Sequence, residues 1–235
     1  MDLTQTIALG MGVAWASGIN LYAALLMLGL MGATGHMELP PGLEILQEPP
    51  VIMAAGFMYC VEFFADKVPG VDTGWDTLHT FVRVPAGAVL AATAVGDVSM
   101  AAQVAGAIIG GTLAGATHAT KAGSRVLINT SPEPVSNWTV SLGEDLAVFG
   151  GLWAALNYPA AFVAALIVFI IAMIWLLPKI WRGVRAVFRR LAALFSNQPA
   201  AAAQPAGSSS DAELRFSLSA PPDAPQGGGE GDARN

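Results

Sequence analysis

Long runs of apolar residues alternate with short polar segments along the 235 residues of the chain. A helix needs about 20 largely apolar residues to cross a bilayer. By this measure the sequence predicts six membrane-spanning helices, at residues 5–31, 50–67, 74–96, 100–126, 137–156 and 158–179. The first and fourth are longer than a bilayer requires, so we expect them to be tilted or broken. The pattern predicts an all-α polytopic membrane protein.

The pattern changes after the last predicted span. Arg182, Arg185 and Arg189 share one helical face, and Val184 and Phe188 lie on another. This is typical of a basic amphipathic helix on anionic headgroups, where it anchors the chain to membrane lipids. The remainder is rich in Ala, Pro, Gly and Ser and is expected to be disordered. We therefore divide the chain into a transmembrane domain at 1–180, an interfacial helix at 181–196 and a disordered tail at 197–235.

Composition supports the membrane class. The chain is 54% hydrophobic and 12% charged, whereas a soluble domain carries about 25% charged residues. Its pI of about 4.9 and net charge of -6 disfavour a nucleic-acid partner. The single cysteine, Cys60, lies in an apolar run and is expected to be a small buried hydrophobe.

The distribution of basic residues predicts an orientation. Six spans place both termini on one side of the membrane, together with the loops after the second, fourth and sixth spans. Those loops hold or adjoin Lys67, Lys121, Arg125, Lys179, Arg182, Arg185, Arg189 and Arg190, whereas the opposite loops contain no Lys or Arg. Basic residues favour the cytoplasmic side, so both termini are predicted to be cytoplasmic. No basic residue precedes Lys67, which argues against a cleavable signal peptide.

Two further patterns concern helix arrangement. Trp75 stands 12 residues before Gly87, and Trp138 stands 12 residues before Gly150. Two related helical hairpins, at about 50–96 and 100–156, are one explanation, and chance similarity is the other. Separately, small residues spaced four apart allow close packing of membrane helices, either within one chain or between two. In the fourth span, Gly106 and Gly110 form such a face, through which copies could form an oligomer.

Four spans each carry one polar face, by a helical phase of about 100° per residue. Their polar residues are Glu62 and Asp66, then Asp72, Asp76, His79 and Arg83, then His118, Lys121 and Arg125, and finally Asn137, Ser141, Glu144 and Asp145. Charges inside a membrane persist where they pair, contact water or act in function. We expect the four faces to point at one another. Arg83 is then expected to pair with Glu144 or Asp145, whereas Lys121 and Arg125 pair with the carboxylates of the second span.

Two helices carry features that could interrupt them. In the third span, Pro85 lacks a backbone donor and is expected to distort the helix and free the carbonyl of Phe81. In the first span, Ser17 to Asn20 form a polar interruption near mid-membrane. Gly18 could permit a break there, and Asn20 could donate a hydrogen bond to a ligand or a neighbouring helix. Broken helices beside buried charges are typical of transporter sites.

These residues predict a small transporter or channel-like protein that binds a small charged solute or a lipid headgroup in a polar cavity open to the cytoplasm. The predicted pathway residues are Asn20, Glu62, Asp66, Lys67, Asp72, Asp76, His79, Arg83, His118, Lys121, Arg125, Asn137, Glu144 and Asp145. The basic residues would neutralise an anion, the carboxylates would gate or carry protons, and a histidine could couple transport to pH. The alternative is a membrane scaffold or accessory subunit with structural ion pairs.

An intramembrane enzyme is the weakest of the three hypotheses. The sequence contains no G-x-S-x-G, H-E-x-x-H or P-loop motif. No Cys/His spacing suggests zinc, so we assign no catalytic residue, metal ligand or cofactor. A carboxylate site for a hard cation is chemically reasonable, but the interleaved basic residues argue that these carboxylates are already paired.

The motifs together resemble a bacterial membrane family named domain of unknown function 4126, over about residues 8–160. The resemblance is carried by Ser-Gly-Ile-Asn at 17–20, Glu62 to Pro69, Trp75-Asp76 with His79-Thr80 and Arg83 to Pro85, His118 with Lys121 and Arg125, Asn129 to Pro134 with Ser136-Asn137, and Glu144-Asp145. It implies a multi-pass protein of the bacterial inner membrane and implies no activity.

Overall fold

The computed structural model describes residues 2–96, 98–130 and 134–195. All regular structure in these ranges is helical. The helices are α1 (Leu3–Ala33), η1 (Pro41–Gln47), α2 (Pro49–Ala65), α3 (Val71–Val95), α4 (Met100–Ile128), α5 (Pro134–Asn157) and α6 (Pro159–Phe195). The predicted disordered tail at 197–235 lies outside the described residues. Residues 1–192 form one compact unit.

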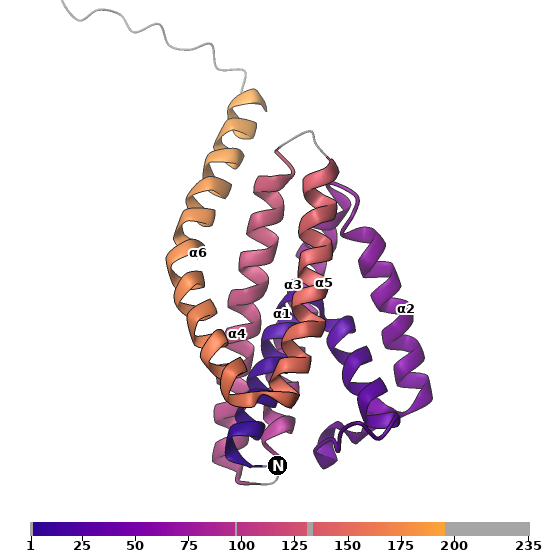
Figure 1. Ribbon diagram of the computed structural model, residues 1–235. Coiled ribbons are helices and arrows are strands. Elements are labelled where there is room, and N and C mark those ends of the chain that lie inside the picture. The colour runs from indigo at the N-terminus through magenta and orange to yellow at the C-terminus, as the bar shows by residue number, and fades with distance from the viewer. Residues whose placement is uncertain (1, 97, 131–133, 196–235) are drawn as a thin grey trace, which may run out of the picture. The chain divides into compact units, whose positions relative to one another are not determined.

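The six long helices coincide with the six apolar segments of the sequence. Among the described residues, α1, α3, α4 and α6 are long and apolar enough to cross a membrane. Helix α2 is apolar but has 17 residues, and α5 carries Glu144 and Asp145 in its middle. The described residues therefore form a helical membrane protein. Gln5 and Met31, near the two ends of α1, line one cavity, so α1 enters and leaves on the same side (Figure 1) and the prediction that it is one of six spans was wrong.

Helix α1 lies at the centre of the unit and contacts α2, α3, α4 and α5 (Figure 1). Its close approach to α4 depends on Gly18, where a Cβ would lie 2.5 Å from the carbonyl oxygen of Ala114 and 2.8 Å from Cβ of Thr117. Two residues later the helix is interrupted, because Asn20 has φ -146° and ψ 95°. The side chain of Asn20 accepts a 3.0 Å hydrogen bond from the backbone N–H of Ala23, as a cap does. The predicted break in the first span is confirmed.

Helices α3 and α4 form the most extensive helix pair. A Cβ at Gly106 would lie 3.1 Å from Cγ2 of Val95, and one at Gly110 would overlap Ala91. The small face of α4 thus packs against α3 within the chain, and an oligomer through it stays a prediction. Helix α3 continues through Pro85 without interruption, so the broken helix beside the charges is α1.

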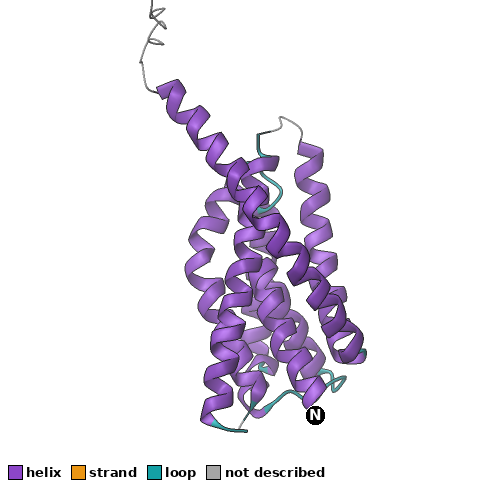
Figure 2. Cartoon of the chain, turned by 90° about the vertical axis from the view of Figure 1, so that its left-hand side faces the viewer, coloured by secondary structure: helices purple, strands orange, loops and turns teal. Residues whose placement is uncertain are grey.

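Helix α6 continues from Pro159 to Phe195 through Pro178 (Figure 2). The residues expected to form a separate interfacial helix therefore extend the last apolar helix. The edges of Phe162 and Phe169 contact Trp15 of α1, with ring centroids 6.1 and 6.0 Å apart. Large side chains thus hold α6 against α1.

The outer surface carries apolar side chains where a soluble protein would carry polar ones. Phe81 is 82% exposed, and Phe57, Ile171 and Trp175 are also largely exposed. Lipid tails solvate such side chains, and the interior can then hold the polar residues. Cys60 belongs to this outer surface, so the expectation that it is buried was wrong.

Candidate functional site

The predicted polar faces meet inside the unit. Every predicted pathway residue except Glu144 is buried. We call the charged cluster the seven residues that ion pairs join: Glu62, Asp66, Asp76, Arg83, Lys121, Arg125 and Glu144. They come from α2, α3, α4 and α5, so the cluster ties four helices together.

Arg83 occupies one end of the charged cluster. Its Nη2 lies 2.6 Å from Oε1 of Glu62, and its Nη1 lies 3.0 Å from Oδ1 of Asp76. The predicted pairing of Arg83 with Glu144 or Asp145 was therefore wrong. Asp76 stands two turns before Arg83 on the same face of α3, and α2 supplies the second carboxylate.

Lys121 lies among all four carboxylates of the cluster. Its Nζ is 2.7 Å from Asp66 Oδ2, with Glu144 at 3.5 Å, Glu62 at 3.6 Å and Asp76 at 3.8 Å. The predicted pairing of Lys121 with the carboxylates of α2 is confirmed.

Arg125 occupies the other end of the cluster. It contacts Glu144 at 2.5 Å and Asp66 at 3.7 Å. The contact with Asp66 was predicted, whereas the closer contact with Glu144 was not. Its Nη1 also donates to the carbonyl and side-chain oxygens of Asn137, at 3.3 and 3.1 Å.

The break in α1 supplies backbone and side-chain partners to this region. Lys121 Nζ donates to the carbonyl oxygen of Ile19 at 3.0 Å, the residue just before the break. Asn20 Nδ2 donates to Asp145 Oδ1 at 3.0 Å, which confirms the expected bond to a neighbouring helix. Ser17, not among the predicted pathway residues, donates to the carbonyl of Arg83 at 2.9 Å. The broken helix is thus bonded to α3, α4 and α5.

Replacement of Asn20 by alanine should lower the free energy of unfolding by about 1–2 kcal/mol, since it removes a capping side chain and the donor to Asp145. Thermal unfolding of the purified protein in detergent measures the effect. Asn20→Ser keeps a capping oxygen and is the matched control, expected to lose less. Equal stability of wild type and Asn20→Ala would show that the cap is not needed.

Asp72 forms a separate polar centre without an ion pair among the described residues. Its Oδ1 accepts from the backbone N–H groups of Gly70 and Thr73, at 2.8 and 2.6 Å, and from Asn129 Nδ2 at 2.8 Å. Its Oδ2 accepts from Asn137 Nδ2 at 3.2 Å. These bonds join the start of α3 to α4 and α5, so Asp72 holds three helices together at this point. Asn129 was not predicted as a pathway residue, although it lies one turn beyond Arg125.

Both predicted histidines are held by hydrogen bonds that define their tautomers. His118 Nε2 lies 3.0 Å from the carbonyl oxygen of Asp76, which only accepts, so this nitrogen carries a proton. Its Nδ1 lies 3.1 Å from Nη1 of Arg83, which only donates, so this nitrogen is bare. His79 likewise donates from Nδ1 to the Trp75 carbonyl, and its Nε2 lies 3.1 Å from the Tyr22 hydroxyl, which can donate or accept. His118 is thus bonded as a neutral imidazole.

Lys67 is buried beside the cluster and not in a solvated loop. Its Nζ donates to the Phe63 carbonyl at 3.0 Å and to Ser141 Oγ at 3.3 Å, and lies 2.9 Å from the Phe63 ring centre. Lys121 and Arg125 are buried as well. Three basic residues that supported the predicted orientation are therefore interior, and that prediction depends on the basic residues from Lys179 onward.

Apart from Glu144, the charged cluster is buried, and some of its oxygens lack a hydrogen-bond partner in the part of the chain that the structure describes. Glu62 Oε2, Asp66 Oδ1 and Asp76 Oδ2 are buried without a hydrogen-bond partner among the described residues. Buried polar atoms are usually paired, so three free oxygens in one cluster are unusual. Within the described residues, no group of three His, Cys, Asp or Glu is arranged to hold a metal ion.

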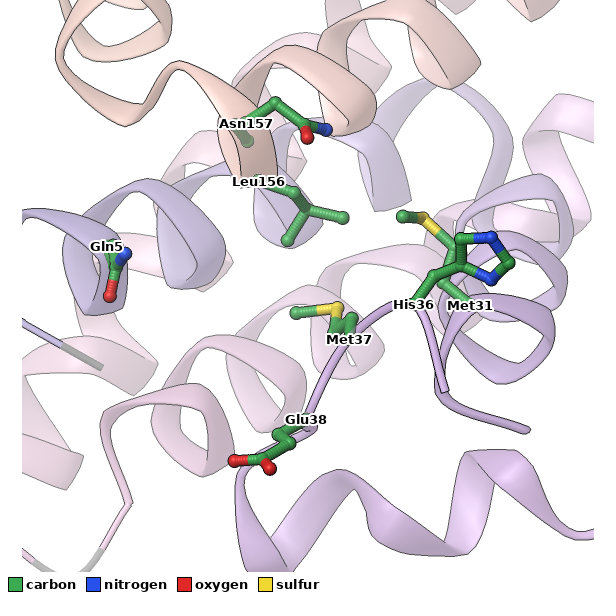
Figure 3. A pocket seen from close by; sticks show the side chains of 8 residues that line it. Gln5, Met31, His36, Met37, Glu38, Leu156 and Asn157 are labelled. Carbon is green, nitrogen blue, oxygen red and sulfur yellow. The ribbon is translucent and has the colours of Figure 1, made fainter. Parts of the chain in front are cut away.

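The principal cavities lie away from the cluster. One of about 310 Å³ lies between the two ends of α1 and the end of α5, where Gln5, Met31 and Asn157 line it (Figure 3). A larger one, of about 620 Å³, lies between α1, α3 and α4 and is lined mainly by apolar residues. Neither cavity is lined by a charged-cluster residue.

Comparisons with known proteins agree with the resemblance in the motifs. Residues 7–179 match the family described as Domain of unknown function (DUF4126). Comparison with curated proteins and with solved structures gives no match. The match includes all of the charged cluster and both parts of the broken helix, and the chain therefore belongs to the DUF4126 family.

Proposed function

We propose that this chain is a small integral membrane transporter that carries a small charged solute, or a lipid headgroup, past the break in α1. The observation that carries the proposal is the charged cluster, buried around a helix that is interrupted at the same level. Each charge costs about 2.5–3.5 kcal/mol at the centre of a spanning helix on insertion scales. Seven such residues therefore carry a large insertion cost, which apolar side chains at the same positions would not have.

The break in α1 supports the proposal on geometric grounds. Interrupted helices place free backbone carbonyls where transporters bind ions and substrates. Here the Ile19 carbonyl accepts from Lys121, and Asn20 is bonded to Asp145. Movement of one part of α1 would break both bonds and expose charged groups to a solute. A bound solute would then replace one of the present ion-pair partners.

The proposal includes a topology. We place α2, α3, α4, α5 and α6 across the bacterial inner membrane, with the end of α6 in the cytoplasm. Both ends of α1 lie at the opposite end of the bundle (Figure 1), so the expectation of two cytoplasmic termini does not fit this arrangement. The basic end of α6 would contact anionic lipid headgroups, because Arg182, Arg185 and Arg189 are exposed. Trp181, 55% exposed, would lie at the same interface.

Thermal unfolding against a panel of compounds tests the proposal. The panel contains alkali cations, Mg²⁺, small amines, phosphate, small carboxylates, phosphoglycerol and phosphoethanolamine, each added to the purified chain in detergent. A ligand at 100 times its Kd stabilises the folded state by about 2.7 kcal/mol, which corresponds to roughly 5–10 °C for a chain of this size. We expect one chemical class to give such a shift, and its flux into proteoliposomes to follow.

Two variants make the result specific. Glu144→Gln alters the most accessible member of the cluster, with 16% of its side chain exposed, and should abolish the shift. Gln5→Ala alters a residue that lines the separate 310 Å³ cavity, and this variant should retain the thermal shift. A panel without any shift, from a wild-type protein shown to be folded, would oppose a solute site.

The second candidate is a non-transporting scaffold. It is favoured by one observation: each basic residue of the cluster has a carboxylate oxygen within 3.0 Å. A structural pair should tolerate exchange of its two charges. In that case Lys121→Asp combined with Asp66→Lys would restore the stability lost in each single variant, with no ligand response in any of them.

A further inference from the structure

The charges of the cluster do not balance. Four carboxylates (Glu62, Asp66, Asp76 and Glu144) are joined by ion pairs to three basic residues (Arg83, Lys121 and Arg125), which leaves a formal excess of one negative charge. An uncompensated charge is strongly disfavoured in a medium of low dielectric constant. A group buried in this way takes up a proton and becomes neutral.

The nearest contacts locate the excess at one end of the cluster. Asp66 has Lys121 at 2.7 Å, and Glu144 has Arg125 at 2.5 Å. Arg83 remains, and it is shared by Glu62 and Asp76. These two side chains are completely buried and each has one oxygen without a partner. Arg83 is therefore the nearest cation to two carboxylates at this end, and Lys121 lies farther away, at 3.6 and 3.8 Å.

The other groups around this pair do not take the proton. The titratable and charged groups that face it are Tyr59 of α2 and Asp66 at its C-terminal end, Arg83 and His79 of α3, His118, Lys121 and Arg125 of α4, Glu144 of α5 and Tyr22 of α1. His118 could be protonated only at Nδ1, which accepts from the Arg83 guanidinium. His79 could take a further proton only at Nε2, 3.1 Å from the Tyr22 hydroxyl, and no ion pair joins His79 to a carboxylate of the cluster among the described residues. The carboxylate pair, with two free oxygens, is the better acceptor.

We propose that Glu62 and Asp76 form a proton-binding pair that holds one proton between them in the folded protein. The proton adds to a free oxygen of one carboxylate, which becomes a neutral carboxylic acid while the other stays paired with Arg83. Two carboxylates that share a site titrate as a pair. Use of this proton as the coupling ion rests on the proposed transport function, but proton binding itself does not.

Amide replacements test the pair, because glutamine or asparagine has nearly the shape of the neutral acid. Glu62→Gln and Asp76→Asn should each change the Tm at neutral pH by less than about 3 °C, since each copies the neutral partner. The double variant leaves Arg83 without a carboxylate at its own end and should lower the Tm by roughly 10 °C. Two additive losses of similar size in the single variants would mean that both groups are ionised, and would overturn the proposal.

Infrared spectroscopy of the full chain in lipid detects the proton directly. The wild type at neutral pH should show a carbonyl band of a protonated carboxyl group, shifted in D₂O. The band should be lost in the double variant and retained in Glu38→Gln, a change at an exposed loop carboxylate. Absence of the band from the folded wild type, or its survival in the double variant, would refute the pair. The Tm values and the infrared band do not depend on solute transport. They therefore test the proton-binding pair even if a transport assay fails.

Discussion

Replacement of Arg83 by alanine is expected to lower the free energy of unfolding by about 3–5 kcal/mol, the usual effect of removing one partner from a buried ion pair. Both carboxylates that now contact Arg83 are completely buried, and neither can reach solvent without movement of α2 or α3. The Tm in detergent measures the loss.

Two controls separate charge from size. Arg182→Ala removes an exposed arginine from α6 and should change stability by about 0.5 kcal/mol or less. Arg83→Met combined with Glu62→Gln fills the space with uncharged groups and should recover part of the loss. A wild-type Tm in Arg83→Ala would mean that the cluster is hydrated and that its ion pairs contribute little.

The second large effect is expected at the crossing of α1 and α4. Gly18→Val should lower the free energy of unfolding by about 3 kcal/mol, the upper end for an overpacked core. A Cβ alone would already overlap the Ala114 carbonyl and Thr117, which both belong to α4. The helices must separate, and the bond from Lys121 to the Ile19 carbonyl should be weakened with them.

Gly150→Val is the matched control, because nothing lies within 4 Å of a Cβ at this position of α5. It should leave stability nearly unchanged. If both variants unfold at the wild-type temperature, the close approach at Gly18 is not required for the fold.

Helical phase predicted which residues would face the interior, and apolar length predicted where the helices lie. The sequence Ser17 to Asn20 also predicted the break in α1, because glycine weakens a helix and asparagine can cap the segment that follows. Phase does not say which helix faces which, so the partners of Arg83 were misassigned. Glu144 and Asp145 show the same limit: adjacent residues differ by about 100° in direction, and they bond to α4 and α1 respectively.

Three further features of the site were not predicted from the sequence. The Ile19 carbonyl is a backbone group, and only the break makes it available to Lys121. Lys67 follows the end of an apolar helix and resembles a loop residue, but its ammonium group lies over Phe63 and is buried. Asn129 could have been noticed, since it follows Arg125 by one helical turn and both approach Asn137 or its neighbour Asp72.

The ion pairs also join residues that are synthesised far apart. Asp66 and its partner Lys121 are separated by 55 positions. When α2 and α3 leave the ribosome, their carboxylates outnumber the basic residues made so far. This shortage of basic residues persists until α4 follows. We therefore expect α2 and α3 to insert stably only together with α4, because a chain that stops before Lys121 would hold uncompensated acids in lipid.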